Sequence, residues 1–341
     1  MGSVALFVPH VGCPQQCSFC DQRAITGGAQ PPTPWQVWQT AQAAASHLGQ
    51  RIKDTEIAFF GGSFTAIPRG QMLSLLAPAK EAVERFGFRG LRCSTRPDAI
   101  DGEMLSLLKA YHMVAVELGA QSMDGEVLRR NRRGHSPEDT VRAAGLIRAA
   151  GLELGLQMMT GLYGSTPEKD VETARALIAL QPATARVYPT VVLEGTHLAA
   201  LYRQGHYHPQ TLEEAVALCA RLLPLFEEAG VRVIRVGLHA QEDVERRRVA
   251  GPYHPAFREL VESRRFLAQL LPELEKLPLG AYVVRVCPRQ LSVATGQRRC
   301  NLEALARRGY AVRFAPDASL APGRFGVGPQ ETRNEKGKQA Q

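Results

Sequence analysis

Three cysteines stand close together near the start of the chain, with the spacing of a metal-binding loop. Cys13, Cys17 and Cys20 follow a short apolar segment in the pattern C-x3-C-x2-C. Thiolate sulfur is a soft ligand that suits iron–sulfur clusters, zinc and copper(I). A structural cluster or zinc finger usually takes four protein ligands, and no fourth cysteine lies nearby in the sequence. We therefore expect an inorganic centre with one open coordination position, at which a small molecule can react.

Two other uses of these cysteines remain as alternatives. A structural zinc site completed by His10 is one, although zinc ligands more often come as two separated pairs. A disulfide is the other, but the first residues lack a secretion signal and the count of 7 cysteines is odd. The remaining cysteines are scattered and are expected to be small buried apolar groups: Cys93, Cys219, Cys287 and Cys300.

Length, composition and charge narrow the class of protein. The chain has 341 residues, of which 45% are hydrophobic, and its mean hydropathy is −0.17. No apolar run approaches the roughly 18 residues that a membrane span needs, so we expect a cytoplasmic protein without a membrane partner. The net charge of +8 and the pI of about 9.3 fit either a mildly basic enzyme or one that binds a polyanion, because lysine and arginine release counterions from phosphates.

The elements that must position the cysteines alternate between strand and helix. Ser136-Pro137 illustrates the helix starts, with a capping serine before a proline in the first turn. Strands are expected at 4–8, 56–60, 91–94, 114–118, 152–158 and 185–192, and helices at 35–48, 71–86, 101–111, 124–132, 137–150 and 167–180. Strands joined by helical crossovers predict a parallel sheet that curls into a partial (β/α)6 barrel. A further helix at 211–229 and a strand at 231–236 follow.

Polar or glycine-rich segments follow these strands, at the end of a barrel where chemistry takes place. Gly61-Gly62-Ser63 follows the second strand, and paired glycines let a backbone approach a ligand closely. The third strand ends in Ser94-Thr95-Arg96-Pro97-Asp98. The fourth and fifth end at residues 117–122 and 156–162. Because the cysteine loop follows the first strand directly, we expect all of these segments to form one site.

In order, spacing and residue type, these motifs resemble the radical S-adenosylmethionine (radical SAM) domain of the Elongator catalytic subunit. They also resemble its stand-alone bacterial relatives and, more distantly, the oxygen-independent coproporphyrinogen oxidases. The resemblance covers roughly residues 4 to 265. The motifs that carry it are Gly61-Gly62-Ser63-Phe64-Thr65, Thr95-Arg96-Pro97-Asp98, Glu117-Leu118-Gly119-Ala120-Gln121-Ser122, Arg133-Gly134-His135, Met159-Thr160-Gly161-Leu162 and Tyr188-Pro189-Thr190.

The resemblance implies two cofactors, a [4Fe-4S] cluster and SAM. The three cysteines would hold three irons, and the fourth iron would chelate SAM. An electron from a donor such as flavodoxin or ferredoxin would then split SAM to give a 5'-deoxyadenosyl radical. The implied SAM contacts are Phe19 at the adenine, Gly61, Gly62 and Ser63 at the methionine amino group, Gln121 at the ribose and Arg133 at the methionine carboxylate, with Ser94 and Gln157 at positions where the relatives often have a carboxylate.

Residues beyond these contacts are candidates for the substrate side of the pocket. Tyrosine can relay a hydrogen atom or an electron, and histidine a proton. Tyr188, His239, Tyr253 and His254 are the residues of these types that follow late strands or turns. Each of these four residues could equally serve to pack the later segments onto the barrel.

The sequence divides into residues 1–275, a barrel with a C-terminal extension, residues 276–327, a small α+β domain, and residues 328–341, a disordered tail. In the small domain, a strand at 281–286, a glycine-led basic loop, a helix at 302–308 and a strand at 310–314 are similar to a KH-type RNA-binding unit. Such a unit clamps a nucleic-acid backbone with a G-x-x-G loop. Gly296, Arg298 and Arg299 are the candidate RNA contacts, although the second glycine of that loop is missing. The alternative is a small appendage that covers the barrel.

These features predict a radical SAM enzyme that modifies tRNA or another RNA. We expect no acetyltransferase domain after the barrel, so the full carboxymethylation chemistry of the Elongator relatives is not implied. One alternative is radical chemistry on a small metabolite or a tetrapyrrole. Another is a non-catalytic RNA-binding protein that contains a metal.

Overall fold

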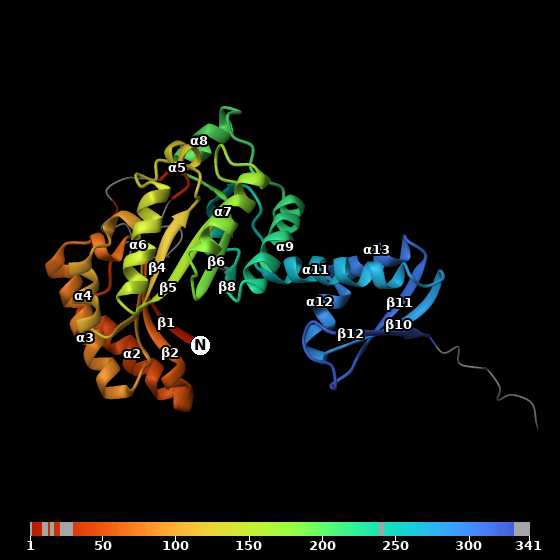
Figure 1. The fold of residues 1–341 in the computed structure, drawn as a ribbon, viewed down its shortest axis with the longest axis horizontal. Helices are drawn as coiled ribbons and strands as arrows, with labels where there is room; N and C mark the ends of the chain where they lie inside the picture. The colour runs from red at the N-terminus through yellow and green to blue at the C-terminus, as the bar shows by residue number, and fades with distance from the viewer. Residues whose placement is uncertain (1, 9–12, 14–16, 21–29, 239–241, 331–341) are drawn as a thin grey trace, which may run out of the picture. The chain divides into compact units, whose positions relative to one another are not determined.

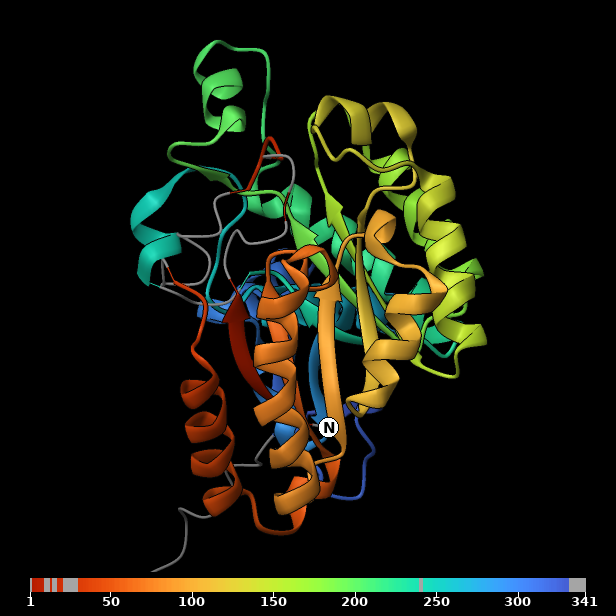
Figure 2. The same ribbon diagram turned by 90° about the vertical axis from the view of Figure 1, so that its left-hand side faces the viewer.

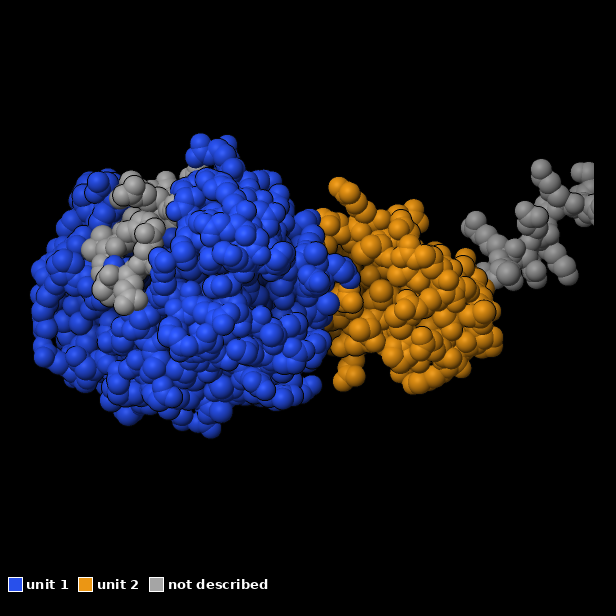
Figure 3. Space-filling view, turned by 90° about the horizontal axis from the view of Figure 1, so that it is seen from above, with its two compact units in different colours: residues 1–255 blue, residues 256–341 orange. Residues whose placement is uncertain are grey.

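The computed structural model describes residues 2–8, 13, 17–20, 30–238 and 242–330, and the chain divides into two compact units, residues 1–255 and 256–341 (Figure 3). The boundary expected at residue 275 therefore falls earlier. Helix α11 (Phe257–Leu274) accounts for the difference, because Phe266, Leu270 and Leu274 belong to the core of the second unit. In the described part of the chain, no helix is both long and apolar enough to cross a membrane.

The first unit contains a seven-stranded parallel sheet in the order β1-β2-β3-β4-β5-β6-β8, which confirms the predicted partial barrel. The strand predicted at 185–192 ends early, at Pro189, and Val192–Leu193 form a separate strand β7 that pairs with β9 (Arg248–Ala250). Pro189 ends β6 because proline has no N–H to donate to a neighbouring strand. The sheet strands are β1 (Gly2–Val8), β2 (Thr55–Gly61), β3 (Gly90–Thr95), β4 (Met113–Gln121), β5 (Glu153–Thr160), β6 (Thr184–Pro189) and β8 (Arg232–Val236).

Helices pack on one face of this sheet (Figures 1 and 2). They start where the cap signals predicted, since the Ser136 side chain accepts from the N–H of Asp139 in a capping box. The main helices are α2 (Pro34–Leu48), α3 (Arg69–Phe86), α4 (Gly102–Ala110), α5 (Gly125–Arg130), α6 (Pro137–Ala149), α7 (Pro167–Ala179) and α9 (Leu212–Glu228). The short helices α8 (His197–Arg203) and α10 (Glu242–Arg247) were not predicted.

Alternation along each strand separates an apolar face from a polar one. In β2, Ile57 and Phe59 are fully buried, whereas Glu56 and Phe60 line a cavity on the opposite side. Successive side chains of a strand point to opposite faces, so one face packs on the helices and the other is left for the site. The sheet thus presents its second face to a cavity rather than to a second apolar layer.

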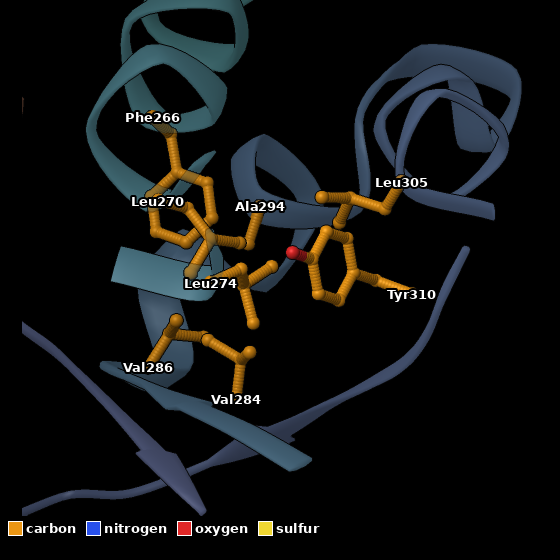
Figure 4. Close-up of a cluster of buried hydrophobic side chains, with 8 residues drawn as sticks. All are labelled: Phe266, Leu270, Leu274, Val284, Val286, Ala294, Leu305 and Tyr310. Carbon is orange, nitrogen blue, oxygen red and sulfur yellow. The ribbon is translucent and has the colours of Figure 1, made fainter. Parts of the chain in front are cut away.

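The second unit has α11 packed against a three-stranded sheet of order β11-β10-β12. Its elements are β10 (Gly280–Val286), α12 (Leu291–Thr295), α13 (Cys300–Ala306), β11 (Tyr310–Pro316) and β12 (Phe325–Pro329). Strand β12 corrects the predicted tail, because Gly328 pairs with Val283 and Phe325 packs on Phe266. Residues 331–341 lie outside the described residues. Figure 4 shows the core, formed by Phe266, Leu270, Leu274, Val284, Val286, Ala294, Leu305 and Tyr310.

Candidate active site

The described part of the cysteine loop is a turn tied to two helices. The N–H of Cys20 donates to the carbonyl of Cys17 at 3.1 Å. Between them, Ser18 is buried and donates its own N–H to the carbonyl of Asn131 at 3.1 Å, at the end of α5. The carbonyl of Ser18 accepts from the N–H of Leu198 at 2.7 Å, in the first turn of α8. The two helices therefore set the position of Cys17 and Cys20.

A cavity of 560 Å³ lies against the polar face of the sheet, and Cys13, Cys17 and Cys20 all line it. The structure also brings the predicted SAM contacts to this cavity, from six separate segments of the chain. These residues are Phe19, Gly61, Gly62, Ser63, Ser94, Gln121, Arg133 and Gln157. Their convergence follows from the parallel sheet, which gathers the carboxyl ends of its strands at one edge.

The surroundings of the thiols fit a cluster carried by three cysteines. Arg133 Nη1 donates to Cys17 Sγ at 3.1 Å, which places a fixed positive charge beside a group that binds metal as a thiolate. Burial raises the pKa of the Cys13 thiol, and nearby Cys17 adds to the rise, while a backbone hydrogen bond from Ser63 opposes it. Among the described residues, no three His, Cys, Asp or Glu side chains surround a single metal ion. A cubane requires a wider arrangement, because each thiolate binds its own iron.

The glycine turn after β2 is shaped by close contact with β1. Gly61 has φ +113°, and a Cβ there would lie 3.0 Å from the carbonyl oxygen of Val8. The N–H of Gly62 donates to the same oxygen at 2.8 Å. Ser63, the next residue, already has a hydrogen-bond partner, because its hydroxyl accepts from the N–H of Arg96 at 3.0 Å. The turn is therefore held from both sides, and the contact of its residues with SAM stays a prediction.

Two amide side chains meet at the ends of β4 and β5. Gln157 Nε2 donates to Gln121 Oε1 at 3.3 Å, and both residues line the cavity. Gln121 has φ +66°, a conformation that costs a non-glycine residue about 1–3 kcal/mol and that often marks a functional site. The register between β4 and β5 shifts at this point, between Gly119 and Gln121. The strained backbone thus accompanies an amide that lines the cavity, and the contact of Gln121 with the ribose of SAM stays a prediction.

Arg133 is held by contacts of its guanidinium and of its backbone carbonyl. Its Nη2 donates to the carbonyl of Gly119 at 2.6 Å. Its own carbonyl accepts from Arg96 Nη2 at 3.1 Å, while Arg96 forms a two-bond ion pair with Asp98 at 2.6 and 2.7 Å. Among the described residues, the buried Nε of Arg133 has no hydrogen-bond partner. An always-charged donor with a free N–H fits the carboxylate of a bound ligand.

Comparison with known families decides the class of this site. The family model of the radical SAM superfamily matches residues 7–177, and that of the Radical_SAM C-terminal domain matches residues 182–266. The chain belongs to the radical SAM superfamily. It is accordingly an enzyme of the radical SAM class, and the cofactors of that superfamily are a [4Fe-4S] cluster and SAM.

Curated relatives of this radical SAM enzyme have names that refer to tRNA or to Elongator. The "tRNA uridine(34) acetyltransferase" of Dehalococcoides mccartyi is 28% identical over 269 residues, which cover 68% of this chain and 58% of that protein. Human "Elongator complex protein 3" is 29% identical over 238 residues, covering 64% and 43%. This radical SAM enzyme therefore spans about half the length of these relatives.

A solved structure shares the fold of this radical SAM enzyme. The archaeal Methanocaldococcus infernus Elp3 with an N-terminal deletion aligns with a TM-score of 0.60 and 22% identity. The alignment covers 81% of this chain and 62% of that chain. At this identity the likeness shows the fold alone.

One of the four predicted relay residues lines the cavity within the described structure. Tyr188 does so, and its hydroxyl accepts from Arg186 Nη1 at 3.3 Å. Burial raises the pKa of Tyr188, although the Arg186 charge opposes the rise. Tyr253 packs against Val191, Leu193 and Val244 and is not a lining residue, and neither is His254. His239 and His10, the alternative zinc ligand, lie outside the described residues.

Two groups of site residues in this radical SAM enzyme escaped the sequence prediction. Asn131 is fully buried and binds the cysteine turn, but an asparagine after a short helix is an ordinary cap. The second group is a set of charged residues inside apolar strands, which have fully or largely buried side chains on the cavity face. The sequence did contain a signal for them, because a charged side chain in a buried strand normally needs a partner of opposite charge. These residues are Glu56, Arg92, Glu117 and Arg186.

The basic loop of the second unit has an unusual backbone. Gly296 starts it with φ +77°, and Arg298 and Arg299 follow with φ +52° and +66°. Both arginines are exposed, between α12 and α13. Cys300 lies beside the loop and is exposed, contrary to the prediction that it is buried, whereas Cys93, Cys219 and Cys287 are buried as expected. The proposed contact of this loop with RNA stays a prediction.

Proposed function

We propose that this radical SAM enzyme reductively cleaves SAM to a 5'-deoxyadenosyl radical and uses the radical to modify tRNA or another RNA. The observation that carries the first part is the convergence of Cys13, Cys17, Cys20 and Arg133 on one cavity. The second part is supported by a relative named for tRNA, which matches 68% of this chain. The net charge of +8 suits a polyanionic substrate.

The chain would divide the work among three sets of residues. The cysteines would hold a [4Fe-4S] cluster, which supplies the electron that splits SAM when it is bound. Arg133 would bind the methionine carboxylate, and the backbone at Gly61 and Gly62 would accept the methionine amino group. Gln121 would hold the ribose and Phe19 would cover the adenine. Fixing a ligand by several such contacts lowers the barrier by orientation, because the entropy is lost on binding and not at the reaction.

The electron would come from a small redox protein of the flavodoxin or ferredoxin class. A chemical reductant replaces it in a first test. The full chain, purified without oxygen and reduced with dithionite, is expected to contain one [4Fe-4S] cluster and to convert SAM into 5'-deoxyadenosine. A Cys17→Ala variant should lose both the iron and the product. Zinc in place of iron, or SAM left intact after reduction, would overturn the proposal.

RNA as the target is tested separately from SAM cleavage. Bulk tRNA from a strain lacking the protein is incubated with the reduced enzyme, digested to nucleosides and compared by mass spectrometry with tRNA from an unreacted sample. We expect a new nucleoside mass and more 5'-deoxyadenosine when tRNA is present. Product formation that ignores tRNA would instead favour a small-molecule substrate, the second candidate function.

The loop at Gly296 is our proposed RNA contact in the second unit. Replacing Arg298 and Arg299 by glutamine removes two positive charges from an exposed loop. If both contact phosphates, the slope of log Kd for tRNA against log salt should fall by about 1–2. The matched control is Arg307→Gln together with Arg308→Gln, two exposed arginines after α13 in the same unit. Equal effects of the two pairs would remove the loop from the interface.

A further inference from the structure

Arg186 presents a guanidinium on the wall of the cavity, from a strand of the sheet. It lies on β6, and its register partner on β5 is Gln157, one of the two amides at the SAM contacts. Its side chain is 12% exposed and lines the cavity. The residue is therefore next to the SAM contacts but is not one of those implied by the family resemblance.

Three contacts fix the plane of this guanidinium. Nε donates to Glu117 Oε2 at 2.9 Å, and Nη1 donates to the Tyr188 hydroxyl at 3.3 Å. The face of the group lies over the Phe60 ring, 4.8 Å from its centroid, at a cation–π distance. Among the described residues, Nη2 donates no hydrogen bond. Arg186 is thus pre-oriented by its neighbours and keeps donor capacity for a ligand.

The ion pairs behind Arg186 indicate the charge that a ligand can carry. Glu56 pairs with both Arg89 and Arg92, Glu153 pairs with Arg89, and Glu117 pairs with Arg186 and lies 4.0 Å from Arg92. Three carboxylates therefore balance three guanidiniums. Arg133 and Arg235 also line the cavity, so its wall suits an anionic ligand.

We propose that Arg186, together with the Tyr188 hydroxyl, binds the carboxylate of a small second substrate in the cavity beside SAM. A guanidinium matches a planar carboxylate through parallel N–H bonds. The ligand is called a substrate because of the function proposed above. Its binding needs neither reduction nor cleavage of SAM, so a failure of the catalytic proposal and a failure of this one are separate results.

Three probes of similar size test the proposal by saturation-transfer NMR on the full chain, without oxygen. Acetate carries one negative charge, acetamide none and methyl phosphate up to two, and each has a methyl group that gives the signal. We expect acetate to bind more tightly than the other two. Arg186→Met should weaken acetate binding about tenfold, since a hydrogen bond to a charged group is lost.

The matched control is Arg89→Lys. Arg89 belongs to the same set of ion pairs but does not line the cavity, so acetate binding should be unchanged. Arg186→Lys keeps a charge beside Glu117 for the case in which Arg186→Met does not fold, and it should still weaken acetate binding. Unchanged binding in a folded Arg186 variant, or absence of acetate binding in the wild type, would overturn the proposal. Tighter binding of methyl phosphate than of acetate would overturn the assignment to a carboxylate.

Discussion

The Ser18 hydroxyl donates a hydrogen bond of 2.7 Å to the side-chain carbonyl of Asn131, 113 positions away in the sequence. Both residues are fully buried. The amide nitrogen of Asn131 is also used, donating to the carbonyls of Val127 and Tyr163 at 2.7 and 2.9 Å. Asn131 thus connects the cysteine turn to α5 and to the segment after β5, and we consider it the main support of the cluster loop.

Replacing Asn131 by alanine is expected to loosen this support. The change leaves the Ser18 hydroxyl and the Tyr163 carbonyl without this partner, while the Val127 carbonyl keeps the backbone N–H of residue 131, so stability should fall by about 1–3 kcal/mol. The cluster should also be lost faster on exposure to air, which is measured as the decay of its visible absorbance. Ser18→Ala is the matched control, because it removes one hydrogen bond and keeps the other two. A cluster lifetime in Asn131→Ala equal to that of the wild type would contradict this role.

Arg133 is expected to affect the affinity for SAM more than the assembly of the cluster. Arg133→Gln removes the guanidinium, including the buried Nε–H that has no partner among the described residues. It should weaken SAM binding about 10–100-fold, the size expected for loss of a hydrogen bond to a charged group. Equilibrium dialysis with labelled SAM gives the Kd, and iron analysis gives the cluster content. Arg132→Gln, at the exposed neighbouring residue, should bind SAM normally. Equal affinities for the two variants would show that Arg133 does not contact SAM.

The parts of the site that lie at strand ends could be predicted from the sequence. Cys17, Gly61 and Gln121 belong to segments that directly follow or end parallel strands, so the topology alone brings them to one edge. The alternation in β2 likewise indicates which side chains face the cavity. For these residues, local sequence and fold class together were sufficient.

Residues that depend on register or on distant partners could not be predicted. The Arg186–Glu117 pair joins positions 69 apart, and it forms only because β4, β5 and β6 are aligned as observed. Asn131 has no feature in the sequence that distinguishes it from other helix caps. The boundary between the units was misplaced because, from sequence alone, the apolar side of α11 could belong to either unit. Only the structure shows that Phe266 of α11 packs on Phe314 and Phe325.

Gly61→Ala is expected to destabilise the first unit and to impair SAM binding. The added methyl group would lie 3.0 Å from the carbonyl oxygen of Val8, and φ +113° is strained for any L-residue, so a loss of about 1–3 kcal/mol follows. Urea unfolding measures it. Gly145→Ala is the control, since Gly145 is exposed in α6 with open space around it and should gain up to about 1 kcal/mol. A neutral Gly61→Ala variant would show that the turn can relax.

His135 is expected to make stability depend on pH. Burial, followed by the nearby charge of Arg133, lowers its pKa from 6.5 to about 4, and its Nε2 donates to the carbonyl of Ala120 at 3.2 Å. Below pH 6.5 His135 becomes protonated in the unfolded chain but stays neutral in the folded protein. Stability therefore falls as the pH drops toward 4.

The size of this effect is up to about 2 kcal/mol between pH 7.5 and 5. Buried Asp170 acts in the opposite direction, because its pKa is raised to about 6 by burial and its folded form keeps a proton that the unfolded chain releases above pH 4. The two contributions are separated with His135→Gln, which should remove the acid-side loss and leave the acid-side gain due to Asp170. Urea unfolding at both pH values measures the difference, with the exposed His206→Gln as control. If the stability of the wild type and of His135→Gln changes equally on acidification, folding does not lower the pKa of His135.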